Sequence, residues 1–245
     1  MTSLYDAAFY DSIASGSLAS ARAVAPFVVD LLAPQKLRSV VDLGCGTGVW
    51  LRAFQDLGIE DVLGVDGDYV DTSSLLIPQE YFQSHDLDRP FLPSRRFDLA
   101  MSVEVAEHLQ PASAEVFVAS LAKLAPAIVF SAAIPGQGGT GHINEQWPGY
   151  WANLFAHHHY HVIDCRPALW DDDRIEPHYR QNLLLFVAEH EIASYPKLKT
   201  WSDRTPEHLM RLVHPGVFQR WIDWGMAQSK AYWDLALSPN GDDRS

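Results

Sequence analysis

The chain has 245 residues, 47% of them hydrophobic and 20% charged, a composition typical of globular proteins and unlike that of disordered or fibrous ones. Its 18 basic and 31 acidic side chains give a formal net charge of −13, which argues against the cationic face that nucleic acid requires. Two cysteines cannot build a disulfide framework, and no apolar stretch approaches the roughly 20 residues that span a bilayer. We therefore expect a cytoplasmic protein with no nucleic-acid or membrane partner.

The first 34 residues carry two helical patterns. They cover Tyr5–Ser15 and Ala19–Leu32, with a short break at residues 16–18, and Pro34 ends the second pattern. We expect residues 1–34 to form an N-terminal helical cap on the domain that follows.

Short apolar runs alternate with helical patterns from residue 35 onward. Such alternation is typical of a parallel sheet covered by helices, and right-handed crossovers stack the strands into a doubly wound sheet. The segments Gly48–Leu57 and Ala112–Leu124 have helical spacing. The predicted strands are Ser39–Leu43, Asp61–Val65, Tyr81–His85, Phe97–Val103 and Ala127–Ile134.

The alternation of apolar runs and helical patterns changes after Trp147. A helix around Tyr150–His157 precedes two further strands, Tyr160–Cys165 and Asn182–Glu189, which the polar segment Arg166–Arg180 joins. The prolines and three consecutive aspartates of that segment predict a long surface loop, and a closing strand pair of this kind suits an antiparallel edge. The predicted fold class for residues 35–190 is therefore α/β, with a seven-stranded mixed sheet whose last strand is antiparallel.

Residues 191–245 predict a helical appendage with a frayed polar end. It carries aromatic residues at Trp221, Trp224, Tyr232 and Trp233. Aromatic residues at helical spacing are typical of core packing. Completing a pocket and mediating a homodimer are the alternatives for this tail.

A glycine-rich turn follows the first predicted strand. The segment Val40–Gly48 ends in D-L-G-C-G-T-G, where glycines let the backbone turn sharply and a ligand approach closely. A dinucleotide site usually has the pattern G-x-G-x-x-G, but here the third glycine comes one residue early and Asp42 would repel a diphosphate. The turn favours a ligand with a positive end, and an NAD-dependent oxidoreductase is kept as the alternative.

The turn and three later segments resemble, in order and in distance, the motifs of class I S-adenosylmethionine (SAM)-dependent methyltransferases. The resemblance covers about residues 35–190 and implies a Rossmann-like fold, S-adenosyl-L-methionine as cofactor and S-adenosyl-L-homocysteine (SAH) as product. Tyr10 lies in a segment similar to the caps that close over SAM, so it packs either on the cofactor or on its own helix. The residues that match the first cofactor-binding motif are Asp42, Gly44, Cys45, Gly46 and Gly48.

The same resemblance implies roles for three later acids. Asp66 ends the second strand, where the family binds the two ribose hydroxyls with a carboxylate. Asp86 matches the acid at the adenine amino group, with the Leu87 amide nearby, and Glu104 lies in the stretch that passes the methionine end. Each acid taken alone could cap a turn, but Asp42, Asp66 and Asp86 all fall at the carboxyl ends of strands, where α/β sheets bind ligands.

Residues that act on the methyl acceptor should follow the fourth and fifth strands. His142 ends a loop with four glycines and stands near Trp147 and Trp151. Histidine exchanges protons near neutral pH, and the indoles would supply an apolar wall, so His142 is the candidate general base. Glu145 would orient it or bind the acceptor, although Asn144 or Glu145 could instead cap the next helix.

Glu104, Glu107 and His108 form a second cluster. At a helix start, residues 104 and 108 share a face whereas 107 and 108 diverge, and His108 is a further catalytic candidate. The stretch resembles small-RNA 3′-end methyltransferases, in which E-x-x-E-H and a later histidine hold a divalent cation. That likeness extends over only a few residues, and we expect no metal.

These patterns predict a SAM-dependent methyltransferase that acts at an oxygen of a small-molecule or glycan-type acceptor, with a histidine as general base. The candidate catalytic residues are His142, Glu145 and His108. Besides the oxidoreductase, the alternatives are a catalytically silent SAM-binding scaffold and a metal-assisted O-methyltransferase.

Overall fold

The computed structural model describes residues 7–202 and 210–236, with side chains described for residues 16–201 and 210–229. Seven strands form one mixed sheet in the order β3-β2-β1-β4-β5-β7-β6. β7 is antiparallel to both of its neighbours, and the other pairs are parallel. The strands are β1 (Ser39–Leu43), β2 (Asp61–Asp66), β3 (Phe82–Ser84), β4 (Leu99–Val103), β5 (Ala127–Ser131), β6 (Tyr160–Ile163) and β7 (Leu184–Ala188).

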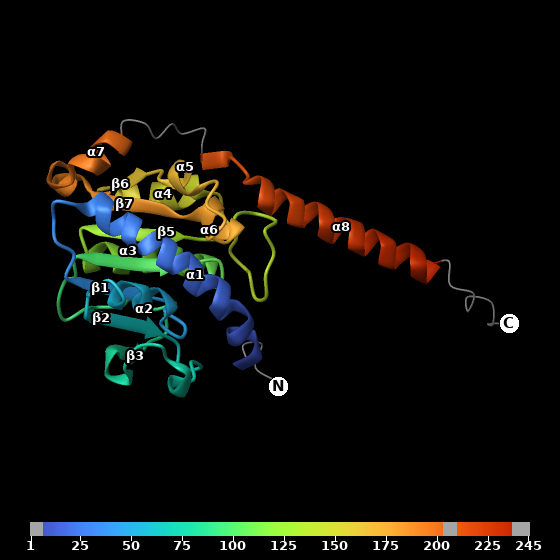
Figure 1. Cartoon of the computed structure of the whole chain (residues 1–245), viewed down its shortest axis with the longest axis horizontal. Coiled ribbons are helices and arrows are strands. Elements are labelled where there is room, and N and C mark those ends of the chain that lie inside the picture. The colour runs from blue at the N-terminus through green and yellow to red at the C-terminus, as the bar shows by residue number, and fades with distance from the viewer. Residues whose placement is uncertain (1–6, 203–209, 237–245) are drawn as a thin grey trace.

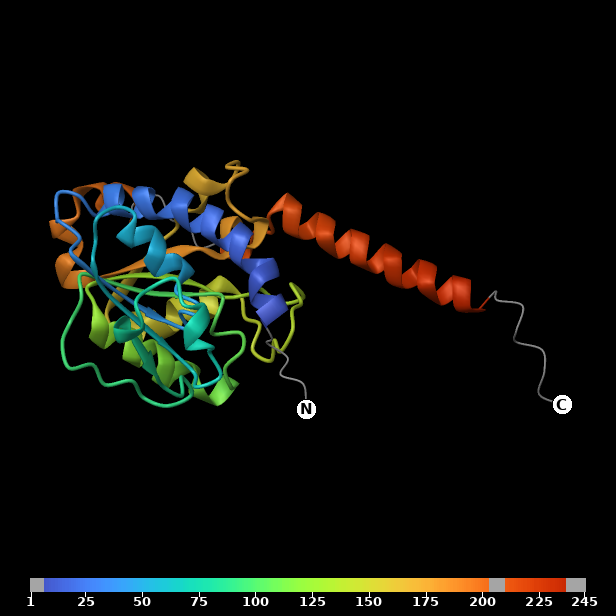
Figure 2. The ribbon, with the colours of Figure 1, turned by 60° about the horizontal axis from the view of Figure 1, so that its bottom comes forward.

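Helices cover both faces of the sheet (Figures 1 and 2). One face carries α1 (Ala7–Leu32), α2 (Val49–Gln55) and α7 (Pro196–Ser202), and the other carries α3 (Ala114–Leu124) and α4 (Pro148–His157). The 3₁₀ turns η1 (Thr72–Ser74), η2 (Gln79–Tyr81), η3 (Pro111–Ser113) and η4 (Glu189–Ser194) lie in the connections.

The sheet separates two apolar cores. Val28 of α1 and Trp50 of α2 belong to the core on one face, and Phe117 of α3 and Trp151 of α4 belong to the core on the other. Because both faces are covered, every residue of β1, β4, β5 and β7 is buried, as expected for strands that read as continuous apolar runs. The predicted fold class, including the antiparallel last strand, is confirmed.

Two expectations about the helices are wrong. The N-terminal segment forms a single helix, α1, which continues through the expected break and contains Pro26. The segment expected as a long loop contains two short helices, α5 (Arg166–Leu169) and α6 (Pro177–Asn182). Each of these has a proline in its first turn, where the missing N–H costs nothing, so these prolines start helices instead of preventing them.

The last helix, α8 (Pro215–Ala236), begins beside α6 and projects away from the body of the molecule (Figure 1). The expectation of core packing is therefore wrong for Trp224, whose exposed fraction is 68%, while Trp221 is half-buried. Tyr232 and Trp233 lie outside the described side chains. Within the described ranges, no helix is both long and apolar enough to cross a bilayer.

Candidate active site

A cavity of about 1340 Å³ opens at the carboxyl ends of β1, β2 and β4. Single small-molecule sites usually have volumes of about 300–1,000 Å³, so this cavity has room for two ligands side by side. Nine of the thirteen residues predicted to bind the cofactor or to act in catalysis line it: Gly44, Cys45, Gly46, Asp66, Asp86, Leu87, Glu104, His108 and His142. Asp42, Gly48 and Glu145 are not among the residues that line it, and the side chain of Tyr10 is outside the described part of α1.

The glycine turn between β1 and α2 is shaped by close contacts. Gly44 has a φ of +87°, and a Cβ atom there would lie 2.3 Å from Cγ2 of Val105. The Gly44 amide donates to the carbonyl of Val65 at 2.7 Å, which ties the turn to β2. Gly48, with a φ of +81°, is the N-cap of α2. The turn thus places a bare backbone at the cavity wall, as a bound ligand would need.

Asp42 lies beneath this turn and is 1% exposed. Its Oδ1 atom has no hydrogen-bond partner among the described residues. Burial, and secondarily the charge of Asp66, raises the pKa of Asp42 to about 7. The Cys45 thiol is buried as well, and its burial, with the nearby charges of Asp42 and Asp66, raises its pKa well above its usual value. Among the residues whose side chains are described, no positive charge offsets these acids.

Asp66 ends β2 and accepts three hydrogen bonds. Its Oδ2 accepts from the Gly46 amide at 2.7 Å, and its Oδ1 accepts from the Gly67 amide at 2.7 Å and from the Tyr69 hydroxyl at 2.5 Å. Burial raises the pKa of Asp66, and these three donors oppose that rise. The carboxylate is thus held in one orientation at the wall of the cavity.

Asp86 lies at the rim of the cavity, and its side chain is 57% exposed. It accepts hydrogen bonds from the Asp88 amide at 3.1 Å and from Nε of Arg89 at 3.1 Å. Leu87 beside it is buried and also lines the cavity. The two residues form the outer edge of the same pocket that Asp66 enters from β2.

Glu104 follows β4 directly, and the helix start expected at residues 104–108 is wrong. Glu104 has a left-handed backbone with a φ of 55°, rare for a residue with a side chain, and the chain then forms a turn. Its amide donates to Ser131, while its carboxylate accepts from Nε2 of Gln137 at 2.9 Å and Nδ2 of Asn182 at 3.0 Å. Amides from two other segments therefore hold this strained residue against the cavity.

The turn brings Glu107 and His108 together, contrary to the expected divergence. Glu107, His108 and His142 each offer a ligand atom, and these atoms lie within 4.8 Å of one another. Glu107 is fully buried, and neither of its carboxylate oxygens has a hydrogen-bond partner of good geometry among the described residues, although the backbone amides of Glu107 and Ala133 lie close enough to favour its charged form. Burial, with the charge of Glu104, raises the pKa of Glu107 well above its usual value, and burial lowers that of His108.

His142 and Glu145 form a pair at the end of the glycine-rich loop. Nδ1 of His142 lies 2.9 Å from Oε1 of Glu145, and both side chains are largely buried. Glu145 also accepts from the amides of Gly136 at 2.7 Å and Gly138 at 2.8 Å, so it fixes the loop as well. The helix-cap alternative is wrong, because the N-cap of α4 is Trp147 and no side chain caps that helix.

A comparison with protein families adds a direct assignment. The model of a family described as a methyltransferase domain matches residues 18–167, which is more than half of the chain. The chain belongs to the class I SAM-dependent methyltransferases. Its cofactor is SAM, and the alternative of an NAD-dependent oxidoreductase is set aside. No curated protein matches the chain significantly.

Solved structures share the fold of this methyltransferase at low identity. SAM-bound CalS10, an amino pentose methyltransferase from Micromonospora echinaspora, is 15% identical with a TM-score of 0.52, and the match covers 77% of this chain and 99% of CalS10. The methyltransferase domain of bacterial CtHen1-C is 18% identical with a TM-score of 0.51, covering 70% and 98%.

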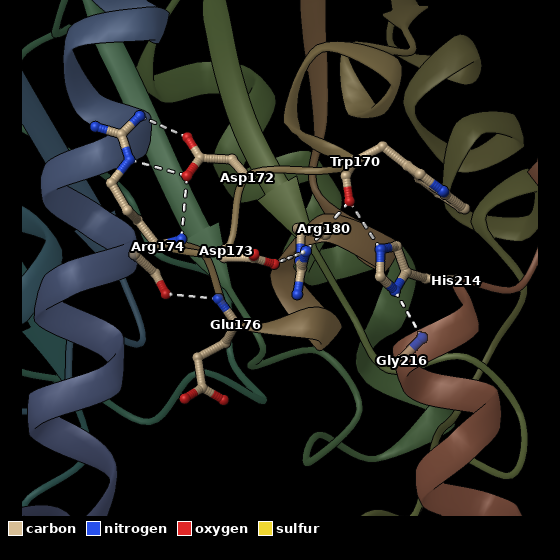
Figure 3. Close-up of polar contacts among 9 residues, drawn as sticks. Trp170, Asp172, Asp173, Arg174, Glu176, Arg180, His214 and Gly216 are labelled. Carbon is tan, nitrogen blue, oxygen red and sulfur yellow. Dashed lines mark hydrogen bonds and ion pairs between the residues drawn. The ribbon is translucent and has the colours of Figure 1, made fainter.

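Several wall residues of the methyltransferase cavity carry no sequence signal. Glu176 just before α6, Tyr179 within α6 and Arg220 of α8 all line it. The segment between α5 and α6 is ordered by its own polar contacts, among them the Arg174–Asp172 pair at 2.6 Å, and the Glu176 amide donates to Oγ of Ser20 at 3.0 Å (Figure 3). Tertiary packing brings these residues to the site, so no local motif reveals them.

Proposed function

We propose that this methyltransferase acts on an oxygen of a small-molecule or glycan-type acceptor, with His142 as general base. The observation that carries the proposal is the His142–Glu145 pair, whose nitrogen and oxygen are 2.9 Å apart. When Glu145 accepts the hydrogen bond from Nδ1–H, Nε2 is left with a lone pair, and His142 lines the cavity. A fixed tautomer beside the cavity is what proton removal requires.

The cofactor position in this proposal follows the wall of the cavity. Asp66 receives the ribose hydroxyls, Asp86 and the Leu87 amide lie at the adenine, and the turn at Gly44, with Asp42 beneath it, faces the charged methionine end. The fit is supported by the crowded glycine turn and by the partnerless Oδ1 of Asp42. In this proposal residues 35–190 bind the cofactor, residues 1–34 are the N-terminal cap and residues 191–245 are an appendage, and the side chain of Tyr10 lies outside the described residues.

The chemistry divides simply between cofactor and protein. Bound SAM supplies an electrophilic methyl carbon and a good leaving group at its sulfonium. The chain has to align the acceptor hydroxyl, exclude water and remove one proton. As the acceptor oxygen bonds to the methyl carbon and the carbon–sulfur bond breaks, Nε2 of His142 takes the hydroxyl proton, and Glu145 stabilises the imidazolium.

The test is a variant of His142. With SAH formation measured over a panel of phenolic and saccharide acceptors, His142→Ala should lower turnover on the accepted compound by about 10²-fold, the usual effect of a general base. The SAM dissociation constant, from calorimetry, should change little. His161→Ala, at an exposed histidine of β6, is the matched control. Full activity of His142→Ala would exclude His142 as the general base. SAM binding by the wild type without any SAH formation would instead support the catalytically silent scaffold.

A metal-assisted O-methyltransferase is a second candidate, favoured by Glu107. A carboxylate that is 0% exposed, with only the backbone amides of Glu107 and Ala133 nearby to offset its burial among the described residues, needs a proton or a cation beside it. One carboxylate and two imidazoles, from His108 and His142, form a donor set that suits a divalent transition metal. A bound ion would lower the pKa of the acceptor hydroxyl, and Glu145 would orient the His142 ligand through Nδ1.

Metal binding itself separates the two candidates. Equilibrium dialysis with Mn²⁺, quantified by electron paramagnetic resonance, should show one ion per chain if the second candidate holds. Glu107→Gln should abolish that binding, and His161→Ala should leave it unchanged. If no stoichiometric Mn²⁺ binds and activity survives a chelator, the metal-assisted candidate is excluded and the general-base role of His142 remains.

A further inference from the structure

The first two turns of α8 form part of the cavity wall. Val217, Arg220 and Trp221 line the cavity, and the Trp221 ring passes 3.8 Å from where a Cβ of Gly136 would be. The helix is anchored at its base. Nδ1 of His214 accepts from the Gly216 amide at 3.0 Å, so Nε2 carries the hydrogen and donates to the Trp170 carbonyl at 2.9 Å (Figure 3).

The cavity-lining face of α8 continues beyond the cavity. Trp224 lies three residues after Trp221, four after Arg220 and seven after Val217. At these spacings it shares their face of the helix. Its exposed fraction is 68%, and Gln228, one turn further along the same face, is also exposed. Since α8 projects from the body (Figures 1 and 2), this face extends the cavity wall outward. We call the strip formed by Val217, Arg220, Trp221, Trp224 and Gln228 the arm face.

The arm face differs from the apolar side of the same helix. Phe218, Ile222 and Met226 recur every four residues and form a continuous apolar stripe, which a lipid or another helix would prefer. On the arm face, two indoles are interleaved with planar hydrogen-bonding side chains, Arg220 and Gln228. Such a mixture suits a pyranose chain, whose C–H faces pack on indoles while its hydroxyl groups bond to the polar side chains.

Charge narrows the class of acceptor. Seven carboxylate side chains and a single guanidinium, that of Arg220, line the described wall of the cavity. The guanidinium lies 3.4 Å from Oε2 of Glu176, so a carboxylate already partners it. A polyanionic chain would be repelled by such a wall, whereas a neutral one would not.

We propose that α8 is an acceptor-binding arm, along which a neutral oligosaccharide lies with the unit to be methylated in the cavity. This inference rests on the proposed methyl transfer and specifies its substrate as an elongated saccharide. From Val217 to Gln228 the arm face is about 16 Å long at 1.5 Å per residue, which exceeds the length of a monosaccharide.

The test compares saccharides of different length. SAH-loaded protein is titrated with malto-, cello-, chito- and laminarihexaose and with the matching disaccharides, by saturation-transfer NMR. At least one hexasaccharide should bind about tenfold more tightly than its disaccharide, since one stacked indole contributes roughly 1.4 kcal/mol. Trp224→Ala should abolish this length dependence and retain SAH binding, because Trp224 is exposed and packs in no core. Met226→Ala, 67% exposed on the apolar stripe, is the matched control and should keep the dependence.

Three results would overturn the arm. The first is an affinity that does not depend on saccharide length in any of the four series. The second is an equal loss of the length dependence in Trp224→Ala and Met226→Ala. The third is a dimer in sedimentation that both variants dissociate, which would make α8 an interface with a second copy. Failure of the arm leaves SAH binding and methyl transfer intact, whereas failure of the proposed function appears as absent SAH binding or as full activity in His142→Ala.

Discussion

At the scale of single residues, Asp66 shows how a site side chain is positioned before any ligand arrives. Two backbone amides and the Tyr69 hydroxyl hold its carboxylate, and burial would otherwise favour its protonated form. The position of Asp66 could be predicted, because it ends a buried strand and matches a motif. Tyr69 could not, since its hydroxyl reaches Asp66 only through the path of the loop.

Asp66→Ala should weaken SAM binding by about tenfold or more, because charge-assisted hydrogen bonds to the ribose would be lost. Isothermal titration with SAM measures the change. Asp61→Ala removes the same charge at the opposite, exposed end of β2 and should leave the affinity within about twofold. An unchanged affinity for Asp66→Ala would remove this residue from the cofactor site.

At the scale of elements, strands were easier to predict than helices. β1 has the predicted bounds because its burial on both faces produces an uninterrupted apolar run. The break predicted near Gly16 was wrong for a packing reason. A Cβ on Gly16 would lie 2.4 Å from Oε1 of Glu176, so the Glu176 side chain packs on α1 at this glycine and the helix continues through it. A sequence pattern cannot distinguish these two uses of glycine.

The turn between β1 and α2 gives a prediction about packing. Gly44→Ala adds a methyl group 2.3 Å from Val105 on top of an unfavourable positive φ, so it should lower stability by about 3 kcal/mol or more and impair SAH binding. Gly58→Ala is a close control, because its φ is +85° but nothing lies within 4 Å of the added atom. It should cost only about 1 kcal/mol. Urea unfolding measures both, and equal losses would show that Val105 is not the cause.

At the scale of the whole molecule, the candidate site joins segments that are distant in sequence. The motifs predicted one wall of the cavity, because its residues follow consecutive strands. The wall formed by α6 and α8 depends on how the last hundred residues fold back on the sheet. Of its residues, only Trp221 belongs to a sequence pattern, the aromatic residues at helical spacing. Glu107 was noted as part of a stretch, but its proximity to His142 depends on a turn where a helix was expected.

The buried acids of this cavity predict how stability depends on pH. Asp42 holds its proton up to about pH 7 in the folded chain, whereas in the unfolded chain it loses the proton near its ordinary value of 3.8. Between these values the folded state binds more protons, so the free energy of unfolding should fall as pH rises and then level off above about pH 8. For Asp42 alone the loss is at most on the order of 4 kcal/mol.

Asp42→Asn removes this titration and keeps the size of the side chain. The variant should therefore gain several degrees in Tm over the wild type at pH 8 and much less at pH 5, as measured by calorimetry without SAM. Asp171→Asn, an exposed acid in the segment after α5, should shift Tm little at either pH. If Asp42→Asn raises Tm by the same amount at both pH values, the buried charge of Asp42 does not destabilise the fold. If the charged end of SAM lies beside Asp42 as proposed, bound SAM should reduce the advantage of the variant at pH 8, which would connect the instability of the buried acid to its proposed role in binding.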